Sequence, residues 1–236
     1  MVARVNSGID GLNGLVSGGF PQGANVLAIG GPGTGKSILS LQFLVWGAMN
    51  GEPGVYLTCD ETKDKLLSQA LDFGWDLTQL EKEKKILIRP IEEEFDIETI
   101  LDVLENDVKK VKARRVVVDS ITMLSVYSKV MPEAFRDAVK GKKLNRFQRF
   151  IEEMKRPQVI AIFQALSGLG TTNLIIAEGD GQSTVPEYAA DGVIRLQQKI
   201  IGNETNRSMT VEKMRSTKIV GGIHGFDFAE GGIHLK

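Results

Sequence analysis

The stretch of sequence that decides the fold is Gly30-Gly31-Pro32-Gly33-Thr34-Gly35-Lys36-Ser37. It fits the pattern G-x-x-x-x-G-K-[ST], in which glycines let the backbone wrap around an anion and a lysine adds positive charge. The segment before it, Ala24 to Gly30, is a short apolar run, and Ser37 to Asn50 after it has the apolar spacing of a helix. The motif therefore lies between a predicted strand and a predicted helix, as a phosphate-binding loop requires.

This phosphate loop predicts a site for ATP and Mg²⁺. Backbone N–H groups at the start of the helix would contact phosphate oxygens, and Lys36 would contact the terminal phosphates. Ser37 would place its hydroxyl oxygen on the metal, because Mg²⁺ takes few protein oxygens and keeps several waters. The residues that we expect to contact the nucleotide are Gly31, Pro32, Gly33, Thr34, Gly35, Lys36, Ser37 and Ile38.

Strand and helix patterns alternate along the rest of the chain. The predicted elements are strand Gly54–Thr58, helix Lys63–Phe73, strand Ile86–Arg89, helix Ile97–Val111, strand Val116–Val118, a helix around Phe147 to Met154, and strand Asn173–Ala177. Alternation of this kind predicts a mostly parallel central sheet flanked by helices. We therefore expect residues 1–236 to form a single α/β domain.

The pattern changes beyond Asp191. Three predicted strands follow one another without helices: Val193–Gln197, Ser208–Met214 and Ile223–Phe228. Consecutive strands without crossover helices are typical of antiparallel pairing. We therefore expect antiparallel strands at the C-terminal edge of the sheet.

Carboxylates are expected at the same edge of the sheet as the phosphate loop. Asp119 ends the β-branched run Val116–Val118, which is typical of a strand buried on both faces, and it has the form of an acid that acts on Mg²⁺. Asp60 and Glu61 follow the strand Gly54–Thr58, and the carboxyl ends of parallel strands share one edge. One of them is a candidate to orient the attacking water, and capping of the next helix is the alternative.

Composition excludes several classes of protein. The 29 Lys and Arg residues balance 30 Asp and Glu residues, which argues against general attraction to nucleic acid or to anionic membrane. The single cysteine, Cys59, excludes an intramolecular disulfide. No apolar run approaches the roughly 20 residues that span a bilayer, and the N-terminal residues lack the apolar run of a signal peptide. We expect no membrane insertion and a cytoplasmic protein.

Most of the chain resembles the KaiC-like branch of the RecA-fold ATPases. Besides the phosphate loop, the blocks that carry the resemblance are Arg4-Val5-Asn6-Ser7-Gly8-Ile9-Asp10-Gly11-Leu12, Gly18-Gly19-Phe20-Pro21-Gln22-Gly23, Thr58-Cys59-Asp60-Glu61-Thr62, Asp119-Ser120 and Lys213-Met214-Arg215. Two segments, Ser125–Pro157 and Thr171–Ala189, carry little of it. The resemblance implies a RecA-like P-loop fold.

The resemblance also implies a shared active site. Subunits of that family form rings, commonly hexamers, with ATP between neighbours, and a K-x-R strand reaches across with its lysine and arginine. Lys213 and Arg215 match this motif, and cations two residues apart share one face of a strand; an exposed basic strand face is the alternative. Asp60 stands where the family usually shows a glutamate pair, which implies slow hydrolysis or a larger role for Glu61.

These observations favour an ATPase that acts as a homo-oligomer, with conformational work or signalling to a partner protein as its output. One alternative is a nucleotide-gated scaffold whose hydrolysis is vestigial. A second is a recombinase paralogue on single-stranded DNA, motivated by the basic residues between Arg136 and Arg156, for which a solvated helix face is the favoured alternative. The loop Glu178–Ala189, which stands where recombinase relatives contact the strand, is acidic and has no Lys or Arg, so DNA is the less favoured partner.

Overall fold

A computed structural model describes residues 2–59, 61–91, 97–122, 124, 144–179, 185–202 and 204–236, with the backbone alone for residues 144–155 and 201. Within these residues, nine strands form one sheet in the order β11-β10-β9-β8-β3-β7-β6-β4-β5. A separate antiparallel pair joins β1 (Arg4–Val5) to β2 (Phe20–Pro21).

The part of the sheet from β8 to β5 is parallel. Its strands, in spatial order, are β8 (Gly192–Ile201), β3 (Asn25–Gly30), β7 (Thr172–Glu178), β6 (Arg115–Asp119), β4 (Gly54–Thr58) and β5 (Ile86–Pro90). Beyond β8 the sheet continues with the antiparallel strands β9 (Glu204–Met214), β10 (His224–Ala229) and β11 (Gly232–Leu235). β3, which leads into the phosphate loop, therefore has neighbours on both sides.

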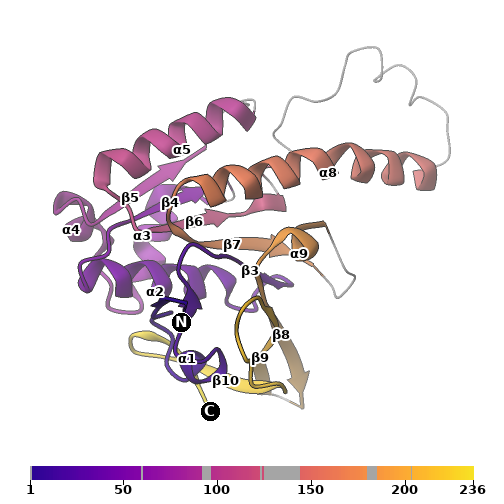
Figure 1. Cartoon of the computed structure of the whole chain (residues 1–236). Coiled ribbons are helices and arrows are strands. Elements are labelled where there is room, and N and C mark those ends of the chain that lie inside the picture. Colours follow the sequence, from indigo (N-terminus) through magenta and orange to yellow (C-terminus); the bar gives the residue numbers. More distant parts are fainter. Residues whose placement is uncertain are drawn as a thin grey trace.

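Helices cover both faces of the sheet (Figure 1). One face carries α1 (Leu12–Leu15), α2 (Lys36–Met49), α3 (Lys63–Leu71) and α4 (Leu77–Lys82). The other carries α5 (Ile97–Val111), α8 (Leu144–Gly168) and α9 (Val185–Ala189). Side chains of β3 alternate between the two cores: Val26 belongs to the first and Leu27 to the second. A strand buried on both faces reads as a continuous apolar run for this reason.

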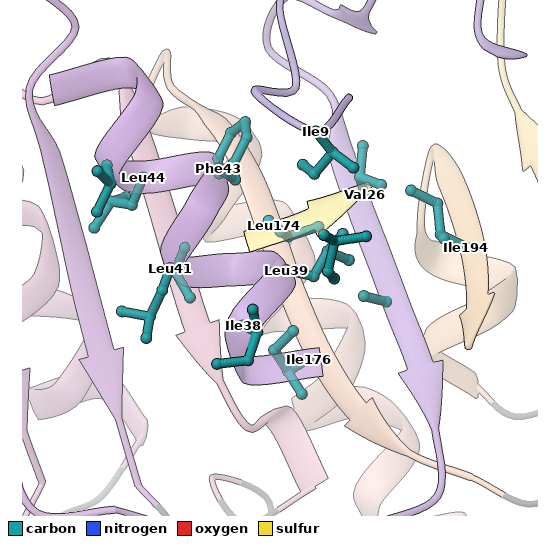
Figure 2. Packing of buried hydrophobic residues seen from close by; sticks show 14 of the residues in the cluster. Ile9, Val26, Ile38, Leu39, Leu41, Phe43, Leu44, Leu174, Ile176 and Ile194 are labelled. Atoms are coloured by element: carbon teal, nitrogen blue, oxygen red, sulfur yellow. The ribbon is translucent and has the colours of Figure 1, made fainter. Parts of the chain in front are cut away.

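Helix α2 is fixed to the centre of the sheet by apolar contacts. Figure 2 shows Ile38 and Leu39 of α2 in one buried cluster with Val26 of β3 and Ile176 of β7. Burying one large apolar side chain contributes about 1.5–3 kcal/mol. The start of α2, where the phosphate loop ends, is therefore held in place by the core.

The predicted architecture is confirmed: a mostly parallel sheet flanked by helices, with antiparallel strands at the C-terminal edge. The sequence did not predict α4 or the last edge strand, β11. β9 and β10 are antiparallel, as expected, but β8 pairs in parallel with β3 along its other side. Between β7 and β8 the chain returns to the amino ends of the parallel strands through α9. This helix is only five residues long and therefore too short to show a helical period in the sequence. In the part of the chain that the structure describes, no helix has both the length and the apolar character needed to cross a membrane.

Candidate nucleotide site

The phosphate loop depends on glycine at two positions. Gly33 and Gly35 have φ angles of 73° and 99°, in the left-handed region that residues other than glycine rarely adopt. A Cβ atom on Gly35 would also lie 2.7 Å from Cζ of Phe228, a residue of β10. The Thr34 hydroxyl donates a hydrogen bond to the Gly31 carbonyl at 2.9 Å and closes the loop on itself.

The two residues predicted to hold Mg²⁺ meet at the end of this loop. The Ser37 hydroxyl donates a hydrogen bond to Oδ2 of Asp119 at 3.0 Å, although 82 positions separate the two residues. Lys36 lies beside them and donates from Nζ to the Gly31 carbonyl at 2.8 Å. The structure therefore brings together the lysine, the hydroxyl and the carboxylate that the sequence predicted.

Asp119, at the end of β6, is almost completely buried. Burial raises the pKa of its carboxyl group, and the opposing influences include hydrogen bonds from Tyr56 and Ser37 and the charge of Lys36. Tyr56 donates its hydroxyl to the same oxygen, Oδ2, at 2.6 Å. Sequence reasoning missed this tyrosine, because within the strand GVYLT it is indistinguishable from an apolar core residue.

The donor set fits magnesium. Among the described residues, no group of three or more His, Cys, Asp or Glu side chains is placed to hold a metal ion. Ser37, at the end of the loop, and Asp119, at the end of β6, supply the protein oxygens, and Mg²⁺ is usually bound through one or two carboxylates together with substrate phosphates and water. A site of this kind needs the phosphates of a nucleotide to complete it.

The carboxylates after β4 are only partly described. The Glu61 N–H donates to Thr58 Oγ1 at 3.2 Å, and the Thr58 hydroxyl donates to the Glu61 carbonyl at 3.0 Å. Thr58 pairs with Asp119 in the sheet register. Glu61, three residues after Thr58, therefore follows β4 at the carboxyl ends of the strands, where Asp119 also lies. The N-cap of α3 is Thr62. Asp60 lies outside the described residues, so the choice between Asp60 and Glu61 as the water-orienting group stays a prediction.

Lys213 and Arg215 lie near the amino ends of the parallel strands, whereas the phosphate loop lies at their carboxyl ends. β9 runs antiparallel to β8, and Lys213 pairs with Val193, which in turn pairs with Leu27 near the start of β3. The phosphate loop leaves β3 after Gly30, roughly 10 Å further along the strand at about 3.3 Å per residue. The structure therefore does not bring these two cations to the phosphate loop of the same chain.

The side chains of Lys213 and Arg215 both contact the region of α9. Lys213 Nζ donates to three carbonyl oxygens, those of Glu187 (3.1 Å), Tyr188 (3.3 Å) and Ala190 (2.5 Å). Arg215 forms an ion pair with Asp191 at 3.1 Å. Partial burial, followed by the charge of Arg215, lowers the pKa of Lys213. Lys213 lies in β9 and Arg215 follows the end of that strand, and both side chains contact the segment from Glu187 to Asp191.

An additional cation, Arg207, lies beside the phosphate loop. Its Nε is 3.4 Å from the Gly33 carbonyl oxygen, and its guanidinium lies 4.6 Å from the ring centroid of Phe228. A cavity of about 500 Å³ opens between the loop and β8, with Thr34 and Gln198 among its lining residues. This volume is within the range of small-molecule sites, roughly 300–1,000 Å³. The sequence offered no signal for Arg207, because it belongs to no motif.

The basic segment that motivated the DNA hypothesis is mostly outside the described residues. Arg136, Lys140, Lys142 and Lys143 are not described, and neither are the side chains of Arg146, Arg149 and Lys155. The side chain of Arg156 in α8 is described and is exposed. The DNA hypothesis therefore stays a prediction from the sequence.

Together, the fold and the loop define a nucleotide-binding P-loop protein of the RecA-like class. A family model described as "ATPase: KaiC" matches residues 5–149 and 144–236. The chain belongs to this KaiC ATPase family.

Similar proteins come from archaea and bacteria. A UPF0273 protein of Aeropyrum pernix is 32% identical, over 99% of this chain and 93% of its own length. The circadian clock oscillator protein KaiC of Synechococcus elongatus is 26% identical, and this chain spans 44% of it. The crystal structure of the KaiC-like protein PH0186 from Pyrococcus horikoshii superposes with a TM-score of 0.84 at 32% identity, over 100% of both chains.

Proposed function

We propose that the protein is a magnesium-dependent ATPase in which residues 1–236 act as one catalytic unit of a homo-oligomer. The observation that carries the proposal is the hydrogen bond between Ser37 and Asp119 at the end of the phosphate loop. It joins a hydroxyl and a carboxylate, the two groups that hold Mg²⁺ in P-loop ATPases. Membership in the KaiC ATPase family supports ATP as the nucleotide.

In the proposed mechanism, the loop N–H groups and Lys36 bind the phosphates, and Ser37 and Asp119 hold the metal. When bound, Mg²⁺ neutralises charge that develops on the transferring phosphoryl group. Glu61 or Asp60 orients a water molecule and accepts its proton. The water oxygen then bonds to the γ-phosphorus, the bond from that phosphorus to the oxygen of ADP breaks, and the products are ADP and phosphate.

The proposed active site is shared between copies. Lys213 and Arg215 lie at the amino edge of the sheet and the phosphate loop lies at the carboxyl edge. If one copy presents its K-x-R face to the loop of the next, the contact is heterologous, and such a contact forms a ring when the rotation between copies closes. The resemblance to KaiC-like proteins favours a hexameric ring, with a partner protein reading its nucleotide state.

A nucleotide-gated scaffold is the second candidate. The Lys213 ammonium already donates to carbonyl oxygens around α9, Ala190 among them. A lysine that stays there does not reach a neighbour's nucleotide, so ATP would bind while hydrolysis remained negligible. Under this alternative, ATP sets the assembly without being consumed at a significant rate.

Equilibrium binding of a fluorescent ATP analogue, with and without Mg²⁺, tests the shared part of both candidates. Lys36→Ala should weaken binding by about tenfold or more, because a charge-assisted contact to phosphate contributes roughly 1.5–3 kcal/mol. The matched control is Lys110→Ala, which removes an exposed lysine of α5 on the other face of the sheet. Equal affinities of wild type and Lys36→Ala would contradict nucleotide binding at this loop. Tight binding without turnover would favour the scaffold.

A further inference from the structure

We propose that Tyr56 is a positioning residue that holds the Asp119 carboxylate and thereby sets the magnesium dependence of nucleotide binding. The inference rests on the proposed function, because it concerns the same metal site. Tyr56 binds neither metal nor nucleotide in this proposal. Its role is to fix the orientation of a group that does.

The sheet places Tyr56 where its hydroxyl can reach Asp119. Tyr56 is in β4 and pairs with Val117 of the adjacent strand β6. Asp119 follows Val117 by two residues, and residues two apart on a strand point to the same face. The tyrosine is long enough to span this offset, and its hydroxyl donates to Asp119 Oδ2 at 2.6 Å.

The hydroxyl lies at the end of a fully buried side chain. Tyr56 is 0% exposed, and its ring belongs to the core cluster beneath α2. Burying a hydroxyl without a hydrogen-bond partner costs roughly 1–3 kcal/mol, so the core alone would favour phenylalanine at this position. Asp119 is the partner that makes a tyrosine favourable here.

A small polar network surrounds this contact. Ser40 Oγ lies 3.2 Å from the Tyr56 hydroxyl oxygen and donates to the Ser37 carbonyl at 2.9 Å. Ser40 is also fully buried. The network therefore connects the first turn of α2, which ends the phosphate loop, to the carboxylate at the end of β6.

Two hydroxyls, those of Ser37 and Tyr56, donate to the same oxygen of Asp119. The terminal torsion of an aspartate is broad, so a carboxylate needs such partners to keep one orientation. Ser37 is itself expected to bind the metal. Tyr56 is then the donor that keeps its hydrogen bond to Asp119 when Ser37 contacts the metal. Loss of an outer-shell partner of this kind typically lowers metal affinity by about 10–100-fold.

The test uses Tyr56→Phe, which keeps the packed ring and removes only the hydroxyl. The affinity for a fluorescent ATP analogue is measured in EDTA and across a Mg²⁺ titration. We expect the Mg²⁺ concentration at half-maximal effect to rise by about tenfold or more, and the affinity in EDTA to match the wild type, because the loop is unchanged. Ser68→Ala removes a hydroxyl from an exposed residue of α3 and should behave as the wild type.

Two results would overturn the inference. One is an unchanged Mg²⁺ midpoint in Tyr56→Phe. The other is an equal loss of affinity in EDTA and in Mg²⁺ together with a lower melting temperature, which would make Tyr56 a core residue only. A wild-type protein that fails to bind the nucleotide under any of these conditions would instead contradict the proposed function, so the two failures are distinguishable.

Discussion

Lys213 donates a hydrogen bond from its ammonium group to the carbonyl oxygen of Ala190 at 2.5 Å, at the amino edge of the sheet. The phosphate loop of the same chain leaves the opposite edge, after Gly30. The lysine and the loop are separated by the length of a central strand. A role for Lys213 in hydrolysis therefore requires a second copy of the chain.

Mixing two inactive variants tests this requirement. Lys36→Ala removes the phosphate contact and Lys213→Ala removes the cation offered to a neighbour, so each variant alone should hydrolyse ATP at least about tenfold more slowly than the wild type. In an exchanged equimolar mixture, about one quarter of heterologous interfaces combine an intact loop with an intact lysine. The measurement is steady-state phosphate release, and we expect about a quarter of the wild-type rate from the mixture.

The double variant Lys36→Ala/Lys213→Ala is the control for this mixture. Mixed with Lys36→Ala, it supplies no intact loop and should restore nothing. A wild-type rate from Lys213→Ala alone, or no recovery in the mixture of the two single variants, would show that the site is not shared.

Asp119 is expected to reduce the stability of the nucleotide-free protein at neutral pH. Burial raises the pKa of its carboxyl group, so the folded protein binds this proton more tightly than the unfolded chain does. Stability therefore falls as pH rises from the ordinary carboxyl range, about pH 4, through the raised pKa. Asp119→Asn should melt at a higher temperature than the wild type at neutral pH, and the gain should shrink as the pH is lowered toward 4.

Thermal melts of both proteins over a series of pH values provide the measurement. The surface variant Asp72→Asn serves as the control and should stay within about 0.5 kcal/mol of the wild type. If Asp119→Asn melts below the wild type at neutral pH, the hydrogen bonds from Ser37 and Tyr56 outweigh the cost of burying the charge.

Gly47 of α2 is required by a buried arginine. A Cβ atom at Gly47 would lie 2.3 Å from Nε of Arg115. Arg115 is 0% exposed and is held by the Glu52 carboxylate at 2.7 Å and the Phe43 carbonyl at 2.6 Å, so it has no room to move. Alanine normally stabilises a helix by about 1 kcal/mol relative to glycine, but overpacking here should lower the free energy of unfolding by about 1–3 kcal/mol.

Denaturant unfolding of Gly47→Ala measures this cost. Gly14→Ala in α1 is the matched change, because a Cβ there meets nothing within 4 Å. It should leave stability unchanged or raise it slightly. A Gly47→Ala variant as stable as the wild type would mean that Arg115 can move aside.

Local patterns made much of the fold predictable. The helix Ile97–Val111 and the strand Gly54–Thr58 have the bounds that their apolar spacing indicated. Glycine spacing likewise placed the phosphate loop, because the positive φ angles of Gly33 and Gly35 are a local backbone requirement. Asp119 was predictable for a similar reason, since it ends a strand whose apolar run is continuous.

What the sequence did not show depends on contacts between distant residues. Tyr56 and Asp119 are 63 positions apart, and only the register of β4 against β6 brings them together. Arg207 is 174 positions from Gly33 and reaches it through the antiparallel edge. The helix α9, which contacts Lys213, is too short for its apolar residues to show helical spacing in the sequence. The roles of Asp60 and of the basic segment Arg136–Arg156 stay predictions.

The central claim is hydrolysis of ATP at a site shared between copies, and steady-state turnover measured across protein concentrations tests it most directly. We expect turnover that Lys36→Ala abolishes, with a specific rate that rises with protein concentration as copies associate. Turnover no higher than that of the Lys36→Ala control would contradict the ATPase, and a specific rate independent of concentration down to the dissociated chain would contradict the shared site.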